Sequence, residues 1–325
     1  MPRKKTISFL LKILIACLAL VFLYNQFIAK QSIDHFSDIN IIDKIKNNIY
    51  GIIVVFLMMF LNWFIEALKW RFLISKIEKI SILRSLRAIF SGITVSAFTP
   101  NRIGEYGGRV FCLKEGDRGQ AVLITVIGSM SQLITTIVFG TIGVLCLPMY
   151  NSEILGIIVL EDITYSIFIF LFVLLDILLI FFFLNTSVVS NILFKIKFLD
   201  TYKKYTTVFS FYNSKELLKV LMYSVLRYVV FSTQFFILLR LFDVHITYFD
   251  AFVLITSMFL IISVIPSIAI TELGVRGSIA ILLFGLVSSN NIGIILSTFF
   301  LWGINLLIPS LIGIFFVFTL NFFRK

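Results

Sequence analysis

The sequence predicts an all-α polytopic membrane protein with about six full transmembrane helices and two re-entrant hairpins in an inverted repeat. Of its 325 residues, 59% are hydrophobic and only 14% are charged, whereas about a quarter of a soluble domain is charged. Six segments hold the roughly 20 apolar residues that a helix needs to cross a bilayer. The net charge of +11 comes from basic residues beside these segments, which favours a membrane over nucleic acid as partner.

The charge of the connecting loops orients the predicted spans. The spans are residues 7–29, 49–70, 120–148, 163–184, 217–241 and 292–320. Lysines and arginines follow span 49–70, and six lysines lie in segment 185–219, while loop 149–162 carries only acidic charges. Because cytosolic loops are enriched in Lys and Arg, we expect both termini in the cytosol. We treat residues 1–325 as a single integral membrane domain.

Two shorter apolar stretches, about 83–99 and 251–265, lead into two related polar motifs. Both motifs read E-x-G-x-R: Glu105-Tyr106-Gly107-Gly108-Arg109 and Glu272-Leu273-Gly274-Val275-Arg276. The loop charges place the approach to the first motif on the cytosolic side and the approach to the second outside. The sequence therefore predicts inverted repeat units at about 49–148 and 217–320, with 7–29 and 163–184 as extra spans.

The motif regions are expected to interrupt the helices at membrane depth. Irregular backbone there has to be buried in protein or line a water-filled cavity. We expect two re-entrant hairpins whose tips approach each other, although hydropathy leaves open whether these regions span the membrane fully. The residues expected to prevent a continuous helix and shape the backbone are Pro100, Gly104, Gly107, Gly108, Pro266 and Gly274.

The charges of the motif regions have two interpretations, which are compatible. Glu and Arg four residues apart share a helix face, so the motifs can be internal ion pairs that offset the cost of a charge in the membrane. Alternatively, the guanidinium groups bind a lipid phosphate, since Arg presents a planar fork of donors. The candidate substrate-binding residues are Arg102, Glu105, Arg109, Glu272 and Arg276.

Asp176 and Arg227 are the other charges deep in predicted spans. Because their spans are consecutive and antiparallel, the sequence predicts an intramembrane ion pair between them. Glu66 lies close enough to the end of its span for its carboxylate to reach water. The cysteines lack paired spacing and no catalytic motif is present, so we expect no metal site, no cofactor and no enzymatic activity.

The run T-P-x-R-x-G-E-x-x-x-R, from Thr99 to Arg109, resembles the lysylphosphatidylglycerol synthase transmembrane-region family. These flippase-like proteins are related to the membrane half of the bacterial multiple peptide resistance factor. The resemblance covers roughly residues 7–320, and Glu272, Gly274 and Arg276 match the family's C-terminal motif. It implies a multi-pass protein of the bacterial inner membrane. The chain ends at Lys325, without the synthase's soluble aminoacyl-transferase domain, so lysyl transfer is not expected.

The predicted function is translocation of a phospholipid or lipid-linked molecule between leaflets, through a polar groove between the hairpins. Two alternatives stay open. One is a non-transporting scaffold or regulator of envelope lipid or glycan synthesis, acting with a further partner or as a homo-oligomer. The other is an intramembrane enzyme that uses Glu105 and Glu272. The sequence does not indicate the lipid, the direction or energy coupling of transport, or the oligomeric state.

Overall fold

The computed structural model describes residues 45–99, 102–149, 162–186, 207–265 and 269–318, with isolated positions at 10, 13, 14, 17 and 188. The described residues form helices and connecting turns without strands. Several predictions fall outside the described residues: most of span 7–29, Pro100, Pro266, most of loop 149–162, and the side chain of Glu272.

Five helices in the described part of the chain are long and apolar enough to cross a membrane. They are α3 (Ile49–Ile74), α6 (Arg118–Cys146), α7 (Asp162–Leu184), α10 (Ser214–Leu241) and the continuous run Asn291–Val317. Each corresponds to one predicted span. The protein is therefore an all-α, multi-pass membrane protein, as the composition predicts.

Short polar side chains cap the N-terminal ends of several of these helices. Asp117 accepts hydrogen bonds from the backbone N–H groups of Gly119 (2.9 Å) and Gln120 (3.2 Å) at the start of α6. Asn213 and Glu216 form a reciprocal capping box at the start of α10. These contacts satisfy N–H groups that the first helical turn leaves without partners. α6 and α10 therefore begin directly after their capping residues, Asp117 and Asn213.

The last long helix contains a wider turn in its middle. The π-helical turn η6 (Gly303–Leu307) joins α13 (Asn291–Trp302) to α14 (Ile308–Val317). Pro309 cannot donate a backbone hydrogen bond, and its ring crowds the carbonyl of Asn305 four residues earlier. A wider turn relieves this crowding. It also carries Asn305, whose amide donates to Gln234 of α10 (2.9 Å).

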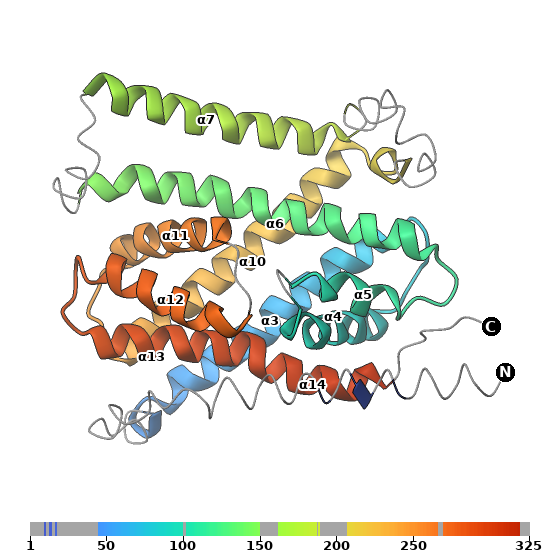
Figure 1. Ribbon diagram of the computed structural model, residues 1–325, viewed down its shortest axis with the longest axis horizontal. Coiled ribbons are helices and arrows are strands. Elements are labelled where there is room, and N and C mark those ends of the chain that lie inside the picture. The colour runs from blue at the N-terminus through green and yellow to red at the C-terminus, as the bar shows by residue number, and fades with distance from the viewer. Residues whose placement is uncertain are drawn as a thin grey trace.

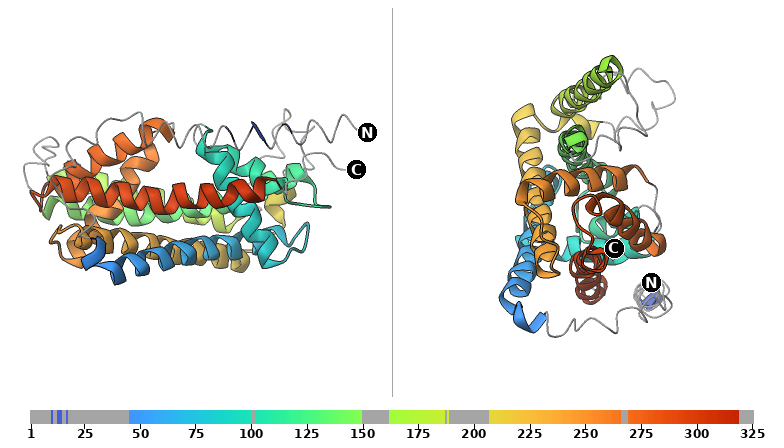
Figure 2. Two further views of the ribbon diagram at one scale, coloured as in Figure 1. Left: turned by 90° about the horizontal axis from the view of Figure 1, so that it is seen from below. Right: turned by 90° about the vertical axis from the view of Figure 1, so that its left-hand side faces the viewer.

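Two helical hairpins pack beside the long helices. One consists of α4 (Ile82–Ala97) and α5 (Gly104–Val110), and the other of α11 (Tyr248–Val264) and α12 (Ala269–Phe284). Figures 1 and 2 show the hairpins at opposite ends of the long helices, and in Figure 1 the C-terminal ends of α4 and α11 point toward the middle. This arrangement agrees with hairpins that enter from opposite sides. That they are re-entrant in a bilayer stays a prediction.

Each hairpin is held by the final long helix of the other half. α6 packs against α11, and α14 packs against α4. Glycines allow both approaches: a Cβ atom on Gly143 would lie 2.8 Å from the carbonyl oxygen of Val253, and one on Gly313 would lie 2.7 Å from the carbonyl carbon of Phe90. Both halves also share the order long helix, hairpin, long helix. The inverted symmetry of units 49–148 and 217–320 remains a prediction.

No continuous helix runs through the first motif region, since α4 ends at Ala97 and α5 begins at Gly104, but the described motif glycines do not lie at this break. They lie inside helices, in α5 and α12: Gly104, Gly107, Gly108 and Gly274. The first hairpin instead leaves the helix between Phe98 and Ile103. Glycine costs about 1 kcal/mol relative to alanine inside a helix, but a Cβ on Gly108 would lie 2.6 Å from the Cα of Gly92 in α4. This glycine therefore lets α5 pack closely on α4.

Glu78 ties together the loops that connect α3 to α4 and α5 to α6. Its carboxylate accepts hydrogen bonds from the backbone N–H groups of Lys114, Glu115 and Gly116 (2.9 to 3.3 Å) and pairs with Arg84 (3.0 Å). Partial burial alone would raise the pKa of Glu78, but these hydrogen bonds and Arg84 hold the pKa below its usual value. The stabilisation is therefore complete above the unfolded-state pKa and is lost as pH falls through the folded-state pKa.

We expect Glu78→Gln to lower the melting temperature of the purified protein by a few degrees near pH 7. The substitution weakens hydrogen bonds to a charged group, at a cost of about 1–2 kcal/mol. The difference from wild type should shrink as the pH falls from about 5 to 3, because wild-type Glu78 then becomes protonated as well. Melting curves at stepped pH measure the effect, and a difference that does not change with pH would contradict it.

Candidate functional site

A row of polar side chains lies along one face of α3. Asn62, Glu66 and Lys69 recur every three or four residues in a largely apolar helix, so they share a face. All three are buried. A buried charge is costly unless it is paired and hydrogen-bonded. Neighbouring helices have to supply the partners of Glu66 and Lys69.

Glu66 is the centre of a buried ion cluster. Its carboxylate contacts three cations from three helices: Lys69 of α3 (2.8 Å), Arg109 of α5 (2.9 Å) and Arg227 of α10 (2.8 Å). Arg109 also pairs with Glu105, one turn earlier on α5. The cluster of Glu66, Lys69, Glu105, Arg109 and Arg227, called the ion cluster below, therefore links the first hairpin to α3 and α10.

Hydroxyl and carbonyl groups complete the surroundings of Lys69. Its ammonium donates to the carbonyl of Gly128 in α6 (3.1 Å) and to the hydroxyl of Ser224 in α10 (3.3 Å). Ser224 in turn lies 2.7 Å from the hydroxyl of Ser131 in α6. Lys69 thus has the three hydrogen-bond partners that an ammonium can use. These bonds fix α6 against α3 and α10.

The ion cluster corrects two predictions. Glu66 does not reach water, because α3 continues to Ile74 and α5 and α10 supply two of its partners. The predicted Asp176–Arg227 pair does not form among the described residues, since Arg227 pairs with Glu66 and Asp176 accepts a hydrogen bond from Thr141 (3.4 Å). The reason is the position of α7, which lies alongside α6 (Figure 1), so that Asp176 contacts the helix that carries Thr141.

The first motif forms the internal ion pair that its four-residue spacing predicts. The Arg109 side chain is only 4% exposed and lies between the carboxylates of Glu105 and Glu66. It is not among the described residues that line the adjoining cavity. Arg109 thus forms ion pairs that join α5 to α3. Its role in substrate binding stays a prediction.

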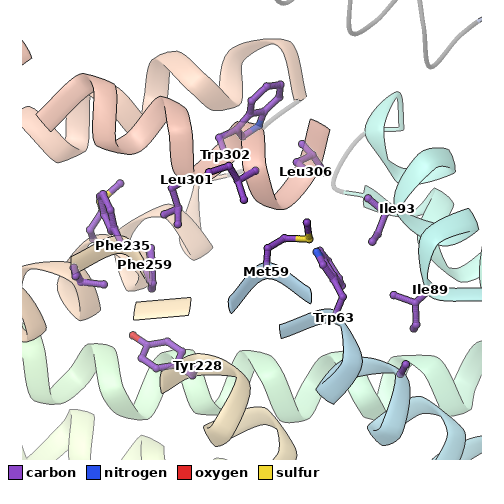
Figure 3. Packing of buried hydrophobic residues seen from close by; sticks show 14 of the residues in the cluster. Met59, Trp63, Ile89, Ile93, Tyr228, Phe235, Phe259, Leu301, Trp302 and Leu306 are labelled. Carbon is purple, nitrogen blue, oxygen red and sulfur yellow. The ribbon is translucent and has the colours of Figure 1, made fainter. Parts of the chain in front are cut away.

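A cavity of about 300 Å³, lined by both polar and apolar side chains, adjoins the ion cluster. Arg102, at the tip of the first hairpin, and Arg276, in the second motif, both line it, together with Arg227. Residues far apart in the sequence therefore meet at one cavity, of a size that suits small ligands. The remaining lining is largely aromatic and amide: Trp63, Gln132, Tyr228, Phe259, Trp302 and Asn305. Figure 3 shows Trp63, Tyr228, Phe259 and Trp302 in this region.

Arg227 is the member of the ion cluster that reaches this cavity. Its side chain is 19% exposed, against 4% for Arg109 and 2% for Lys69. The Nε atom donates to Asn62 (2.9 Å), and the guanidinium carbon lies 4.7 Å from the ring centre of Trp63. A hydrogen bond and a cation–π contact hold the guanidinium in place. The sequence analysis did not predict that Arg227 reaches a cavity and pairs with Glu66. Ser224 and Arg227 lie three residues apart, and so on one face of α10, which indicates a face that meets other polar groups.

Arg102 occupies a strained turn between the helices of the first hairpin. Its φ of 57° lies in the left-handed region, which costs a residue other than glycine about 1–2 kcal/mol. Thr99 stabilises the turn: its carbonyl accepts from the N–H of Arg102 (3.2 Å) and its hydroxyl accepts from the N–H of Gly104 (2.9 Å). Such strain persists where the surroundings enforce it, often at functional sites.

Among the described residues, the cavity and the ion cluster together carry more cations than carboxylates. Three cations face two carboxylates in the cluster, and Arg102 and Arg276 add to the cavity lining. Positive charge in a site of low dielectric attracts anions. The arrangement can hold a group such as a phosphate.

The described residues contain no group of three or more His, Cys, Asp or Glu that could hold a metal ion. Glu105, one member of the suggested catalytic pair, is engaged by Arg109. The side chain of Glu272, the other member, lies outside the described structure.

Comparison with known proteins finds a family match over nearly the whole chain. The family described as the lysylphosphatidylglycerol synthase TM region matches residues 9–313, which include both hairpins and the cavity residues. No curated protein and no solved structure matches the chain.

Proposed function

The chain belongs to the lysylphosphatidylglycerol synthase transmembrane-region family, and from this premise we propose that it moves a phospholipid or lipid-linked molecule between leaflets. The headgroup would pass through the cavity between the hairpins while the acyl chains stay in the bilayer. The proposal places the protein in the bacterial inner membrane with both termini in the cytosol, and it assigns no catalytic step.

The observation that carries this proposal is the meeting of Arg102 and Arg276 at one cavity. Each comes from a different hairpin, and the hairpins lie at opposite ends of the long helices (Figure 1). A phosphate bound between them would be shared by the two hairpins, so it can pass from one to the other. Arg227 extends this row of guanidinium groups, which match phosphate oxygens in pairs.

Two further features support transport. Both halves have the order long helix, hairpin, long helix, and each hairpin packs against the final long helix of the other half. Discontinuous helices that meet between two related halves are typical of transporters, whose substrate sites lie near the membrane midplane. Here the described helices break next to Arg102 in the first hairpin, and α12 carries Arg276. If the protein works in this way, the substrate would bind at the cavity.

We expect Arg102→Gln and Arg276→Gln each to slow lipid translocation by about tenfold, the equivalent of one lost charge-assisted contact worth roughly 1.4 kcal/mol. The measurement is the rate at which a fluorescent phospholipid in reconstituted liposomes becomes accessible to an external quencher. Arg240→Gln is the matched control, because Arg240 is exposed near the C-terminal end of α10 and its side chain donates, among the described residues, only to the carbonyl of Ile246 (3.5 Å). Unchanged rates in both cavity variants would count against the proposal.

A scaffold that transports nothing is the second candidate. The internal pairing of Glu105, Arg109 and Glu66 favours it, because closed ion pairs serve packing as well as they serve transport. Wild-type protein that is folded in liposomes and moves neither zwitterionic nor anionic phospholipid would support the scaffold instead.

A further inference from the structure

A second basic pocket lies at the C-terminal end of α3, away from the central cavity. Its volume is about 360 Å³, and its polar lining consists of Arg71, Ser75 and Lys79, with Tyr223 of α10 opposite them. Leu68 and Phe72 form an apolar part of its wall. This end of α3 leads into the loop that the charge pattern predicts to be cytosolic. The pocket is therefore placed where a membrane helix leaves the bilayer.

The two cations of this pocket are available to an anion. The Nε atom of Arg71 donates to the carbonyl of Ile80 (3.1 Å), which fixes the guanidinium and leaves its terminal nitrogens for other contacts. Neither Arg71 nor Lys79 forms an ion pair with any described residue. The carboxylates at this end are engaged elsewhere: Glu216 pairs with Lys76 (2.7 Å) and Glu78 with Arg84 (3.0 Å).

We propose that this pocket binds the phosphate of an anionic lipid of the inner leaflet. Arg71 and Lys79 would hold the phosphate oxygens, the hydroxyl of Tyr223 would add a hydrogen bond, and the start of the acyl chains would lie against Leu68 and Phe72. The apolar wall distinguishes a lipid from free phosphate, which gains nothing from it. Basic pockets between helices on the cytosolic side are suited to lipid headgroups. This site does not depend on the proposed transport function.

Chemical labelling of Lys79 tests the site directly. The full-length protein is placed in nanodiscs of phosphatidylcholine alone or with about 30 mol% phosphatidic acid, treated with an amine-acetylating reagent, and analysed by peptide mass spectrometry. We expect phosphatidic acid to slow acetylation of Lys79 about fivefold, which corresponds to about 1 kcal/mol for a cation at an anionic surface. Lys215, exposed at the start of α10, is the internal control and should change less.

Arg71→Gln should remove the protection of Lys79 without altering the labelling of Lys215. Arg71→Lys, which keeps the charge, should retain part of the protection and thereby exclude misfolding as the cause. Equal protection of Lys79 and Lys215 in wild type would overturn the site. Protection of Lys79 by inorganic phosphate in phosphatidylcholine nanodiscs, to the same extent as by phosphatidic acid, would overturn a lipid as its occupant.

Discussion

Glu66→Ala is expected to cost about 3–5 kcal/mol of stability, because the substitution leaves buried cations without their common carboxylate. Lys69 and Arg109 would lose a contact of 2.8 or 2.9 Å while they remain almost fully buried. At a few degrees per kcal/mol, the melting temperature should fall by roughly 10 °C. The decay of the monodisperse peak on size-exclusion chromatography after heating to stepped temperatures measures this.

Glu105→Ala is the matched control for Glu66→Ala. Glu105 also pairs with Arg109, but its side chain is 25% exposed and it contacts only one cation of the ion cluster. A partly exposed ion pair contributes about 1 kcal/mol or less. If the two variants melted at the same temperature, Glu66 would not be the centre of the cluster in energetic terms.

Gly313→Leu is expected to separate α14 from the first hairpin. Even a Cβ atom at this position would lie 2.7 Å from the carbonyl carbon of Phe90 and closer still to its oxygen. It would also meet the hydroxyl of Thr94, which donates to the carbonyl of Ser310 across the same contact (2.8 Å). Because backbone atoms cannot yield as a side chain can, we expect a loss at the upper end of the 1–3 kcal/mol typical of overpacking, or more.

Gly277→Ala is the control for a glycine without this constraint. Apart from its chain neighbours and the backbone of its own helix, no described atom lies within 4 Å of a Cβ built on Gly277, which is also helical. Alanine there should be neutral or stabilise the protein by up to about 1 kcal/mol. The same heating assay compares the two variants, and similar melting temperatures would show that the α14–α4 contact has room for a side chain.

The fold class and the position of the long helices could be predicted from the sequence, because both depend on apolar length alone. The ion pair within the first motif could also be predicted, since residues four apart on a helix are neighbours whatever surrounds them. The ion-pair partner of Arg227 could not be predicted from the sequence. Asp176 and Glu66 were both available to it, and only the packing of α7 beside α6 and of α3 beside α10 decides between them.

The burial of Glu66 was missed for a related reason. Distance from the end of an apolar segment predicts whether a side chain reaches water, but α5 approaches α3 from another part of the chain and removes that water. The spacing of Asn62, Glu66 and Lys69 on one face of α3 was a signal that this face meets protein. Likewise, Gly108 was interpreted as a helix breaker, although a helical glycine can serve equally for close packing.

Each hairpin packs against the final long helix of the other half, and these contacts restrict how the hairpins can move. The first hairpin cannot swing away from α14 without giving up the contact at Gly313, and α11 is bound in the same way to α6 at Gly143. A rearrangement that opened the cavity and kept both contacts would carry α4 together with α14, and α11 together with α6. The two hairpins would then move with helices of the opposite half and not on their own.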